Sequence, residues 1–334
     1  MRNLVCIGAC YLDTILSVPF YPEEDSKLRA TNLQVRRGGN CPNTLEVFQQ
    51  LLREESLSGG EAGHHVKTYL ISCLPSRDAP ATATIADSFG PGSAVDLSRC
   101  IYRAGSSQAA SSYVLRSAAS GSRTLVNYTD LPDMTVEEFV AAVEDLSDDD
   151  DNDDDDTWFH FEGRIPETTL QCIRYLRRSK AKAVVSVEVE KPGREGLEEL
   201  AAEADVVFYS RSWAEDKRYE SAQHCLSAQS GVARRASHLL CTWGSQGASC
   251  LSLPSEKSVS CSATQPGQAI RVVDTVGAGD TFIAGMLFGL LCHTRDWNDE
   301  KKVRFAVQLA TLKVQQEGFD GVGAEVARLE CGVS

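Results

Sequence analysis

The run VDTVGAGDTFIAGM, residues 273–286, indicates the fold of this chain more directly than any other stretch. Gly277, Ala278 and Gly279 stand between two aspartates, and the apolar pattern of a helix follows at once. The first turn of a helix has free backbone N–H groups and the positive end of the helix dipole, so a glycine-rich entry suits an anion such as phosphate. The acidic side chain of Asp280 needs a separate explanation, because it would repel a phosphate held beside it.

Two interpretations of Asp280 are open from the local sequence. In the first, Asp280 faces a second substrate and accepts a hydroxyl proton while the anion site holds a transferring phosphoryl group. In the second, Asp280 only caps the helix, with Thr281 beside it. Gly-x-Gly-Asp turns are common at helix starts, so this run alone does not decide between the two.

The composition is that of a folded globular protein with a strong excess of acid. The chain has 334 residues, 42% of them hydrophobic, and a formal net charge of −14. Such a charge argues against a nucleic-acid partner or an anionic membrane, because both attract clustered lysine and arginine. Much of the charge comes from the run SDDDDNDDDD, residues 147–156, which we predict to be a disordered, solvent-exposed loop.

Several features predict a soluble, cytoplasmic protein. The 12 cysteines are scattered, with no C-x-x-C pair, which favours reduced and mostly buried thiols. Asp13 interrupts the apolar run at the N-terminus, so we interpret that run as a first strand rather than a signal peptide. The longest apolar stretch, Phe282–Cys292, is about half as long as a membrane span.

Short β-branched runs alternate with amphipathic segments, which predicts an α/β fold with a Rossmann-type parallel sheet flanked by helices. Several predicted strands are apolar throughout, as expected for parallel strands covered on both faces. The predicted strands are Leu4–Ile7, Thr68–Ile71, Trp158–Phe161, Ala183–Val189, Val206–Tyr209 and His238–Thr242. The predicted helices, besides the one near Ala278, are Cys41–Arg53, Pro166–Arg178, Leu197–Ala204 and Ala222–Ala236.

Two helix-poor segments, residues 14–37 and 99–128, interrupt this alternation. Within the second, SSYVLRSAASGSRTLVNY predicts a hairpin that turns at Ser120 and Gly121. We expect the two segments to pair as a small β-sheet attached to the main domain. Over the carboxyl ends of the main strands, such a sheet would be placed to close as a lid on a ligand.

A second glycine pair opens another helix, in the run RGGNCPN at residues 37–43. Asn40 and Asn43 are three residues apart, so both amides fit on one face of the first turn, where they could bind the hydroxyls of a neutral polyol. The alternative is a helix N-cap beside a surface asparagine. Asp13, just after the first strand, has the same two interpretations: a buried acceptor for two sugar hydroxyls, or an ordinary turn acid.

Taken together, GAGDTF, GGNxxN and the acid after the first strand resemble the motifs of the PfkB-type, ribokinase-like carbohydrate kinases. That family has a Rossmann-like domain covered by a β-sheet lid. Other runs resemble the ATP-dependent branch that phosphorylates a ketohexose at O1, most typically D-fructose to fructose 1-phosphate. They are ASGSRT (119–124), FHFEGR (159–164), VSVEVEKP (185–192), ADVVF (204–208) and EGFDG (317–321). The resemblance identifies residues 1–334 as one domain, and leaves the acidic run and part of 56–94 unexplained.

The resemblance implies a role for each motif. It implies Asp280 as the catalytic base, with Gly277, Ala278 and Gly279 as the anion hole for the phosphoryl group. The residues implied to bind the ketose, beside Asp280, are Asp13, Gly39, Asn40 and Asn43. The residues implied to bind the nucleotide are Arg123, which would reach the phosphates from the lid hairpin, and Gly244, Ser245, Gln246 and Gly247.

The resemblance also implies ATP and Mg²⁺ as cofactors. K⁺ is a further expected cation, because Asp274 matches the position that helps to bind a monovalent cation in this family. The family's Asn-x-x-Glu motif near the magnesium is missing from residues 209–215, as it is from the ketohexose branch. Glu188 and Glu190, on one face of a predicted strand, either order water around magnesium or are simply solvated.

In the ketohexose branch, the lid of one subunit closes over the site of the other. This implies a homodimer through the lid sheet, with Asp25 as a contact from the partner subunit. Lys27 stands where that branch tends to have an acid, which weakens the inference for Asp25.

Two other functions remain as alternatives. One is another sugar or nucleoside kinase of the family, and the other is a non-catalytic relative that binds sugar or nucleotide. The presence of Asp280 with both glycines argues against the second. A Rossmann dehydrogenase is disfavoured, because no G-x-G-x-x-G follows the first strand.

Overall fold

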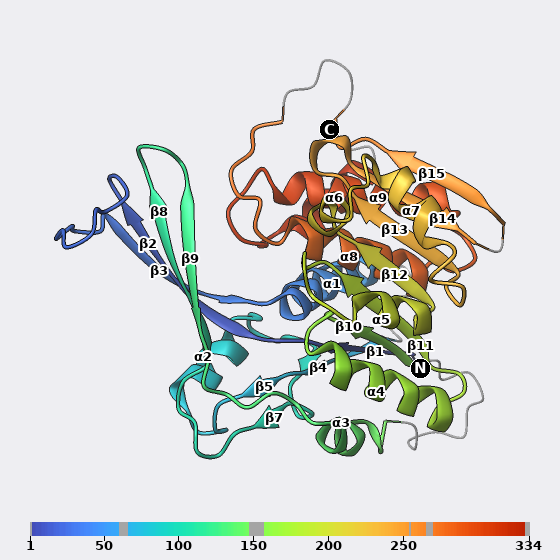
Figure 1. Cartoon of the computed structure of the whole chain (residues 1–334), viewed down its shortest axis with the longest axis horizontal. Helices are drawn as coiled ribbons and strands as arrows, with labels where there is room; N and C mark the ends of the chain where they lie inside the picture. The colour runs from blue at the N-terminus through green and yellow to red at the C-terminus, as the bar shows by residue number, and fades with distance from the viewer. Residues whose placement is uncertain (1, 60–65, 147–156, 254, 265–269, 331–334) are drawn as a thin grey trace.

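A mixed, mainly parallel sheet forms the centre of the protein. The computed structural model describes residues 2–59, 66–146, 157–253, 255–264 and 270–330. Over these residues the main sheet has nine strands in the order β15-β14-β13-β12-β11-β10-β1-β4-β6 (Figure 1). The strands from β6 to β13 are parallel, and β14 and β15 add an antiparallel edge. Their bounds are β1 Arg2–Ile7, β4 Val66–Ile71, β6 Val95–Asp96, β10 Thr157–Phe161, β11 Val184–Val189, β12 Val206–Tyr209, β13 His238–Thr242, β14 Ala248–Ser252 and β15 Lys257–Cys261.

Helices cover both faces of this sheet, so the central strands contribute to two separate cores. In β1, Leu4 and Cys6 pack into one core, and Val5 and Ile7 into the other. Helices over the first core are α1 Asn40–Leu57, α2 Pro80–Asp87, α8 Ala278–Leu291, α9 Asp299–Lys313 and α10 Val322–Glu330. Helices over the second core are α3 Val136–Val143, α4 Pro166–Ser179, α5 Leu197–Glu203, α6 Arg211–Asp216 and α7 Ala222–Gln229. Burial on both faces explains why the strand sequences are apolar throughout.

The predicted α/β fold is confirmed, and each predicted strand of the main sheet is found within two residues of its expected ends. The helix predicted over residues 222–236 is shorter, because α7 ends at Gln229. Ser230 and Gly231, which follow, are weaker helix formers than alanine and begin a turn instead. The helix predicted from Cys41 runs four residues further than expected, to Leu57.

A second sheet, here named the lid sheet, extends from one side of the main body (Figure 1). Its strands are β2 Tyr11–Val18, β3 Asn32–Gly38, β8 Ala110–Ser117 and β9 Arg123–Tyr128, in the order β3-β2-β8-β9. Strands β8 and β9 form the expected hairpin, and Gly121 in its turn has a φ of 68°. Both helix-poor segments supply strands, but residues 101–102 pair instead with Cys73–Leu74, as β7 with β5.

Two expectations concern segments rather than the sheets. The acidic run at residues 147–156 lies outside the described residues. In the described part of the chain, every helix is too short or too polar to cross a lipid bilayer.

Gly39, at the start of α1, is required by the backbone itself. Its φ is 110°, and a Cβ there would lie 2.1 Å from the carbonyl oxygen of Ala9. We therefore expect Gly39→Ala to lower the free energy of unfolding by about 3 kcal/mol or more, measured by urea denaturation. Gly59→Ala is the matched control, because Gly59 also has a positive φ, of 80°, but no heavy atom of the described residues lies within 4 Å of its Cβ position. The control should cost about 1 kcal/mol, and equal losses in the two variants would refute the steric explanation.

Candidate active site

A large cavity of about 810 Å³ lies between the lid sheet and the main body. One wall is formed by the carboxyl ends of β11, β12 and β13, and another by the first turns of α1 and α8. The lid sheet contributes residues such as Asp13, Arg36 and Val114. The carboxyl edge of a parallel sheet is where α/β proteins bind their ligands.

The first turn of α1 brings both asparagines to this cavity. Asn40 Nδ2 donates a hydrogen bond to Glu188 Oε2 at 2.7 Å, and Asn43 Nδ2 donates to Asp280 Oδ2 at 2.8 Å. The N-cap of the helix is Gly39, and Asn43 is only 4% exposed. The alternative of an N-cap beside a surface asparagine is therefore wrong.

The first turn of α8 has the glycine-rich backbone that its sequence suggested. Gly277 is the N-cap, with a φ of 77°, and a Cβ there would meet the ring of Phe319 at 2.3 Å. At Gly279 a Cβ would have no heavy atom within 4 Å among the described residues, so packing within the chain does not require this glycine. Ala278 begins the helix, and no described side chain caps it.

Asp280 lies in this first turn with its side chain turned into the protein rather than capping the helix. It is 8% exposed and accepts the hydrogen bond from Asn43. Burial, followed by the negative charge of Glu188, raises the pKa of Asp280 well above its ordinary value. The capping interpretation of Asp280 is therefore wrong, and the carboxyl group is available at the cavity wall.

Asp280 lies near three glutamates whose charges act on it, and two of them, Glu188 and Glu190, line the same cavity. Burial raises the pKa of Glu188 to about 8 and that of Glu162 to about 7. Glu190, just after β11, is exposed and also lines the cavity. Several carboxyl groups this close are unfavourable unless they take up protons or a cation. Carboxylate oxygens are the protein ligands that Mg²⁺ prefers, so the exposed Glu190 fits a magnesium ion at this cavity, with Glu188 beside it already bound to Asn40 and His160.

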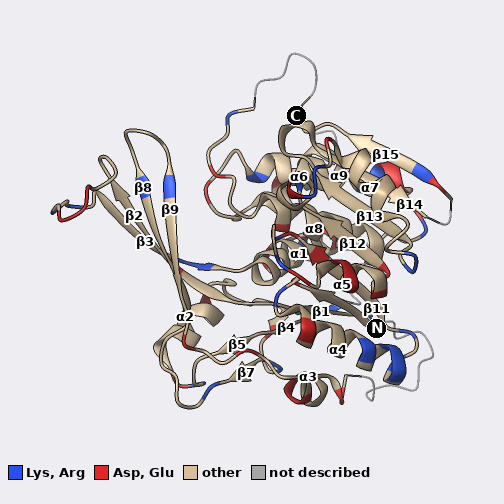
Figure 2. Cartoon of the chain, in the orientation of Figure 1, with Lys and Arg blue, Asp and Glu red and all other residues tan. Residues whose placement is uncertain are grey.

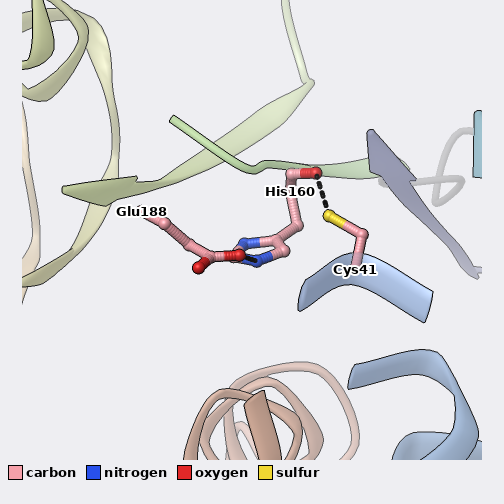
Figure 3. Close-up of side chains that lie close together, drawn as sticks. All are labelled: Cys41, His160 and Glu188. Atoms are coloured by element: carbon pink, nitrogen blue, oxygen red, sulfur yellow. Dashed lines mark hydrogen bonds and ion pairs between the residues drawn. The ribbon is translucent and has the colours of Figure 1, made fainter. Parts of the chain in front are cut away.

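Glu188 is buried rather than solvated, and its contact with His160 helps to fix its position. His160 Nε2 lies 3.1 Å from Glu188 Oε1 (Figure 3). His160 Nδ1 lies 2.8 Å from Ser186 Oγ. Trp158 Nε1 donates to the same Ser186 oxygen at 2.8 Å. Ser186 therefore links Trp158 and His160, and His160 contacts Glu188 through its other ring nitrogen. Of the two interpretations of Glu188, simple solvation is wrong.

Cys41, His160 and Glu188 together have a spacing that could hold a metal ion, with one ligand atom from each within 4.8 Å of the others. Both imidazole nitrogens, however, already have protein partners. The Cys41 thiol donates to the His160 carbonyl oxygen at 4.0 Å (Figure 3). Burial lowers the pKa of His160 to about 3, which keeps it neutral. The cluster is therefore a support for Glu188. The sequence run FHFEGR contained His160 but gave no sign of this role.

Asp13 enters the cavity from β2 of the lid sheet. Its Oδ1 atom is buried and has no hydrogen-bond partner among the described residues. Burial raises the pKa of this carboxyl group. A Cβ at Gly38 would lie 2.5 Å from Asp13 Oδ2, so the glycine beside it leaves the space that this side chain occupies. An unpartnered acceptor of this kind suits a ligand that brings hydroxyl groups.

Arginines of the lid sheet supply the positive charge around the cavity, and Figure 2 shows basic residues on β8 and β9. Arg123, on β9, is exposed and lines the cavity. Arg116, on β8, forms an ion pair with Glu317 at 3.2 Å, and Arg36, on β3, forms one with Asp274 at 3.3 Å. Both ion pairs link the lid sheet to the main body.

Asp274 has a cation beside it, but one that the protein itself supplies. Lys313 Nζ donates to both the backbone carbonyl and Oδ2 of Asp274, each at 3.0 Å, and the Lys313 side chain is fully buried. The monovalent-cation site expected at Asp274 stays a prediction. The geometry does not favour it, because K⁺ would have to share both oxygens with an ammonium group.

Two predicted parts of the site lie apart from the cavity walls. Gly244, Ser245 and Gln246 form a short 3-10 helix after β13, followed by Gly247, and none of these residues is part of the cavity lining. Asp25 is exposed in the connection between β2 and β3, with a φ of 59°. Their roles toward the nucleotide and the partner subunit stay predictions.

Known proteins resemble the chain over nearly its whole length. The pfkB family of carbohydrate kinases matches residues 1–322. Mouse (Mus musculus) ketohexokinase is 30% identical over 328 residues, which cover 96% of this chain and 99% of that protein.

Solved structures of ribokinases share the fold. Ribokinase from Giardia lamblia has a TM-score of 0.74 at 16% identity and covers 100% of this chain and 99% of its own. Arabidopsis thaliana ribokinase, complexed with ribose and ATP, has a TM-score of 0.70 at 19% identity and covers 98% of both chains. The expected ribokinase-like fold is confirmed.

Proposed function

We propose that this chain, which belongs to the pfkB family of carbohydrate kinases, transfers a phosphoryl group from ATP to a primary hydroxyl of a ketohexose. The reaction we favour converts D-fructose to fructose 1-phosphate. The observation that carries the proposal is the buried carboxyl group of Asp280, at the start of α8. Asn43 donates a hydrogen bond to it, and it lines a cavity that is also lined by Asp13. The similarity to mouse ketohexokinase supports a ketohexose as the acceptor.

Asp280 would act as the base toward the sugar hydroxyl. A buried carboxyl group with a raised pKa accepts a proton more readily than an exposed one. The transition state of phosphoryl transfer is loose, so the hydroxyl loses its proton late, and Asp280 first has to orient the nucleophile. Its raised pKa and its fixed position serve both tasks.

The acceptor sugar would be held opposite this base. Asp13 Oδ1 has no partner in the described part of the protein, so it can accept hydrogen bonds from sugar hydroxyls. Asn40 donates its amide N–H to Glu188, which leaves its carbonyl oxygen for a sugar hydroxyl. A site built from such acceptors discriminates against ligands that lack the hydroxyls.

The phosphoryl group would lie at the first turn of α8. The backbone N–H groups near Gly277, Ala278 and Gly279 and the positive end of the helix dipole stabilise negative charge there. Arg123 would add positive charge at the nucleotide phosphates from the lid sheet. Magnesium, held near Glu188 and Glu190, would neutralise charge on the phosphate oxygens. Closure of the lid sheet would exclude water, which otherwise competes with the sugar for the phosphoryl group.

The test is a survey of acceptors with purified protein and MgATP. Fructose should give ADP release well above the rate without sugar, and NMR of the product should place the phosphate at O1. Tagatose, ribose and adenosine are the comparison substrates. A clear preference for ribose or adenosine would replace the ketohexose by another acceptor of the family. Binding of fructose and ATP without ADP release would favour a non-catalytic protein.

Replacement of the proposed base has a distinct kinetic signature. We expect Asp280→Asn to lower kcat about 10³-fold or more, because the amide cannot accept the proton, while the KM for ATP changes little. Arg123→Ala should show the opposite pattern, with a raised KM for ATP. Asp87→Asn, at an exposed position of α2, is the control and should leave both constants unchanged. Near-normal turnover by Asp280→Asn would rule out Asp280 as the base.

The outer face of the lid sheet supports a homodimer as the working form. Side chains alternate between the faces of a strand, so the neighbours of cavity-lining residues point away from the cavity. Five of these outward residues are large, apolar and exposed: Leu33 60%, Val35 56%, Tyr113 46%, Val126 63% and Tyr128 52%. A face of this composition on a four-stranded sheet fits a second copy of the same sheet.

A charge placed on this face should dissociate such a dimer. We expect Val126→Asp to convert a dimer to a monomer in sedimentation-velocity experiments at micromolar concentration, because the new carboxylate would be buried without a partner. Leu57→Asp is the matched control, since Leu57 is 76% exposed at the C-terminal end of α1 and is not part of the lid sheet. A monomeric parent protein would contradict the proposed dimer.

A further inference from the structure

Arg37, the arginine that precedes the glycine pair, is buried at the end of β3. Each of its three guanidinium nitrogens donates a hydrogen bond to another side chain. The residue is only 6% exposed. Its Nε donates to Ser88 Oγ at 3.0 Å, Nη1 donates to Asn43 Oδ1 at 3.1 Å, and Nη2 donates to the carboxylate of Glu46. The guanidinium carbon also lies 4.4 Å from the centre of the Phe89 ring. These contacts hold the group in one orientation, between α1 and the two residues that follow α2.

The contact with Asn43 decides which way that amide points. Arginine has only donors, so the Asn43 atom that faces it must be the carbonyl oxygen. The NH₂ group of Asn43 is then directed to the other side, where it meets Asp280 Oδ2 at 2.8 Å. Arg37 therefore orients the NH₂ group of Asn43, which donates the hydrogen bond to Asp280. Arg37 itself makes no hydrogen bond to Asp280 in the described structure.

We infer that Arg37 is a positioning residue, which holds the Asn43 amide so that it fixes one carboxylate oxygen of Asp280 and leaves the other toward the acceptor hydroxyl. The inference rests on the proposed function in one respect, the assignment of Asp280 as the base. The surroundings of Asp280 show why such a support is needed. Glu188, Glu190 and Glu162 all add negative charge near the carboxyl group, and Asn43 supplies the side-chain hydrogen bond that favours its charged form.

A lysine cannot replace Arg37 in this arrangement. Its ammonium group is a single point of charge, whereas the planar guanidinium reaches Glu46, Asn43 and Ser88 at once. In Arg37→Lys the ammonium should remain with the carboxylate of Glu46, and the carbonyl oxygen of Asn43 should lose its fixed partner. The substitution keeps the positive charge, so its effects report on orientation rather than on charge.

The first experiment is a double-mutant cycle on kcat. Arg37→Lys should lower kcat about 10-fold to 100-fold, because small displacements of a catalytic group are costly, with little change in the KM for ATP. Asn43→Ala should have a similar or larger effect. If Arg37 acts through Asn43, adding Arg37→Lys to Asn43→Ala should lower kcat by less than about twofold further. Two losses that multiply in the double variant would overturn the inference.

A matched control separates positioning from stability. Arg103 is another arginine with several fixed contacts, to Glu138 and to the carbonyl oxygens of Pro132 and Asp133, but away from the cavity. Arg103→Lys should lower the melting temperature and leave kcat unchanged. If Arg37→Lys does not fold, Glu46→Gln removes the charged partner of Arg37 instead and should produce an intermediate loss of kcat. An unchanged kcat in every Arg37 and Glu46 variant that folds would also overturn the inference.

The second experiment does not depend on activity. The carboxyl pKa of Asp280 can be followed by NMR in protein labelled with ¹³C at the aspartate carboxyl groups, with the signal assigned from Asp280→Asn. Loss of the hydrogen bond from Asn43 should raise the pKa of Asp280 in Arg37→Lys and in Asn43→Ala, but not in Arg103→Lys. An unchanged pKa in Arg37→Lys would refute the positioning role. If the parent protein phosphorylates no sugar, the proposed function fails, while this measurement still decides the role of Arg37.

Discussion

The hydrogen bond from Asn43 to Asp280 joins the two helix starts on which the cavity depends. α1 and α8 each begin after a glycine with positive φ, and each directs its first turn to the same space. Behind this bond the two helices pack directly, since Thr44 Oγ1 donates to the Asp280 carbonyl at 3.2 Å and the rings of Phe48 and Phe288 meet edge to face at 6.2 Å. Two positive helix ends therefore meet where an acid and an amide face each other.

This arrangement has an energetic cost that a purely structural site would not carry. Glu188 and Glu162 lie close enough to Asp280 for their negative charges to raise its pKa, and no lysine or arginine forms an ion pair with any of these three acids among the described residues. Buried acids without a counter-charge destabilise a fold. Destabilisation of this kind is typical of sites that bind a cation and accept a proton during their reaction. Here the apolar packing of both cores offsets it.

The fold could be predicted in detail because its signals are local. Apolar runs of β-branched residues define the parallel strands, and the Ser120-Gly121 turn defines the lid hairpin. Within the site, the motif glycines and the polar residues beside them, such as Asp280, Asn43 and Asp13, were likewise expected at one cavity and lie there. The sequence could not reveal what burial does to them. Glu188 was compatible from the sequence both with ordering water around magnesium and with simple solvation, because only the pairing of β10 with β11 places His160 and Ser186 beside it.

The residues that support the site were missed for the same physical reason. Their partners lie far away in the sequence: Arg37 contacts Ser88, and Lys313 contacts Asp274. At the end of β3, two adjacent arginines have different roles: Arg36 joins the lid sheet to the main body, and Arg37 contacts Asn43, which binds Asp280. Arg36 forms an ion pair with Asp274 in the cavity lining, while Arg37 is buried between α1 and the residues that follow α2. The ion pair that joins the lid sheet to the main body and the contact that orients Asn43 are therefore made by adjacent residues of one strand.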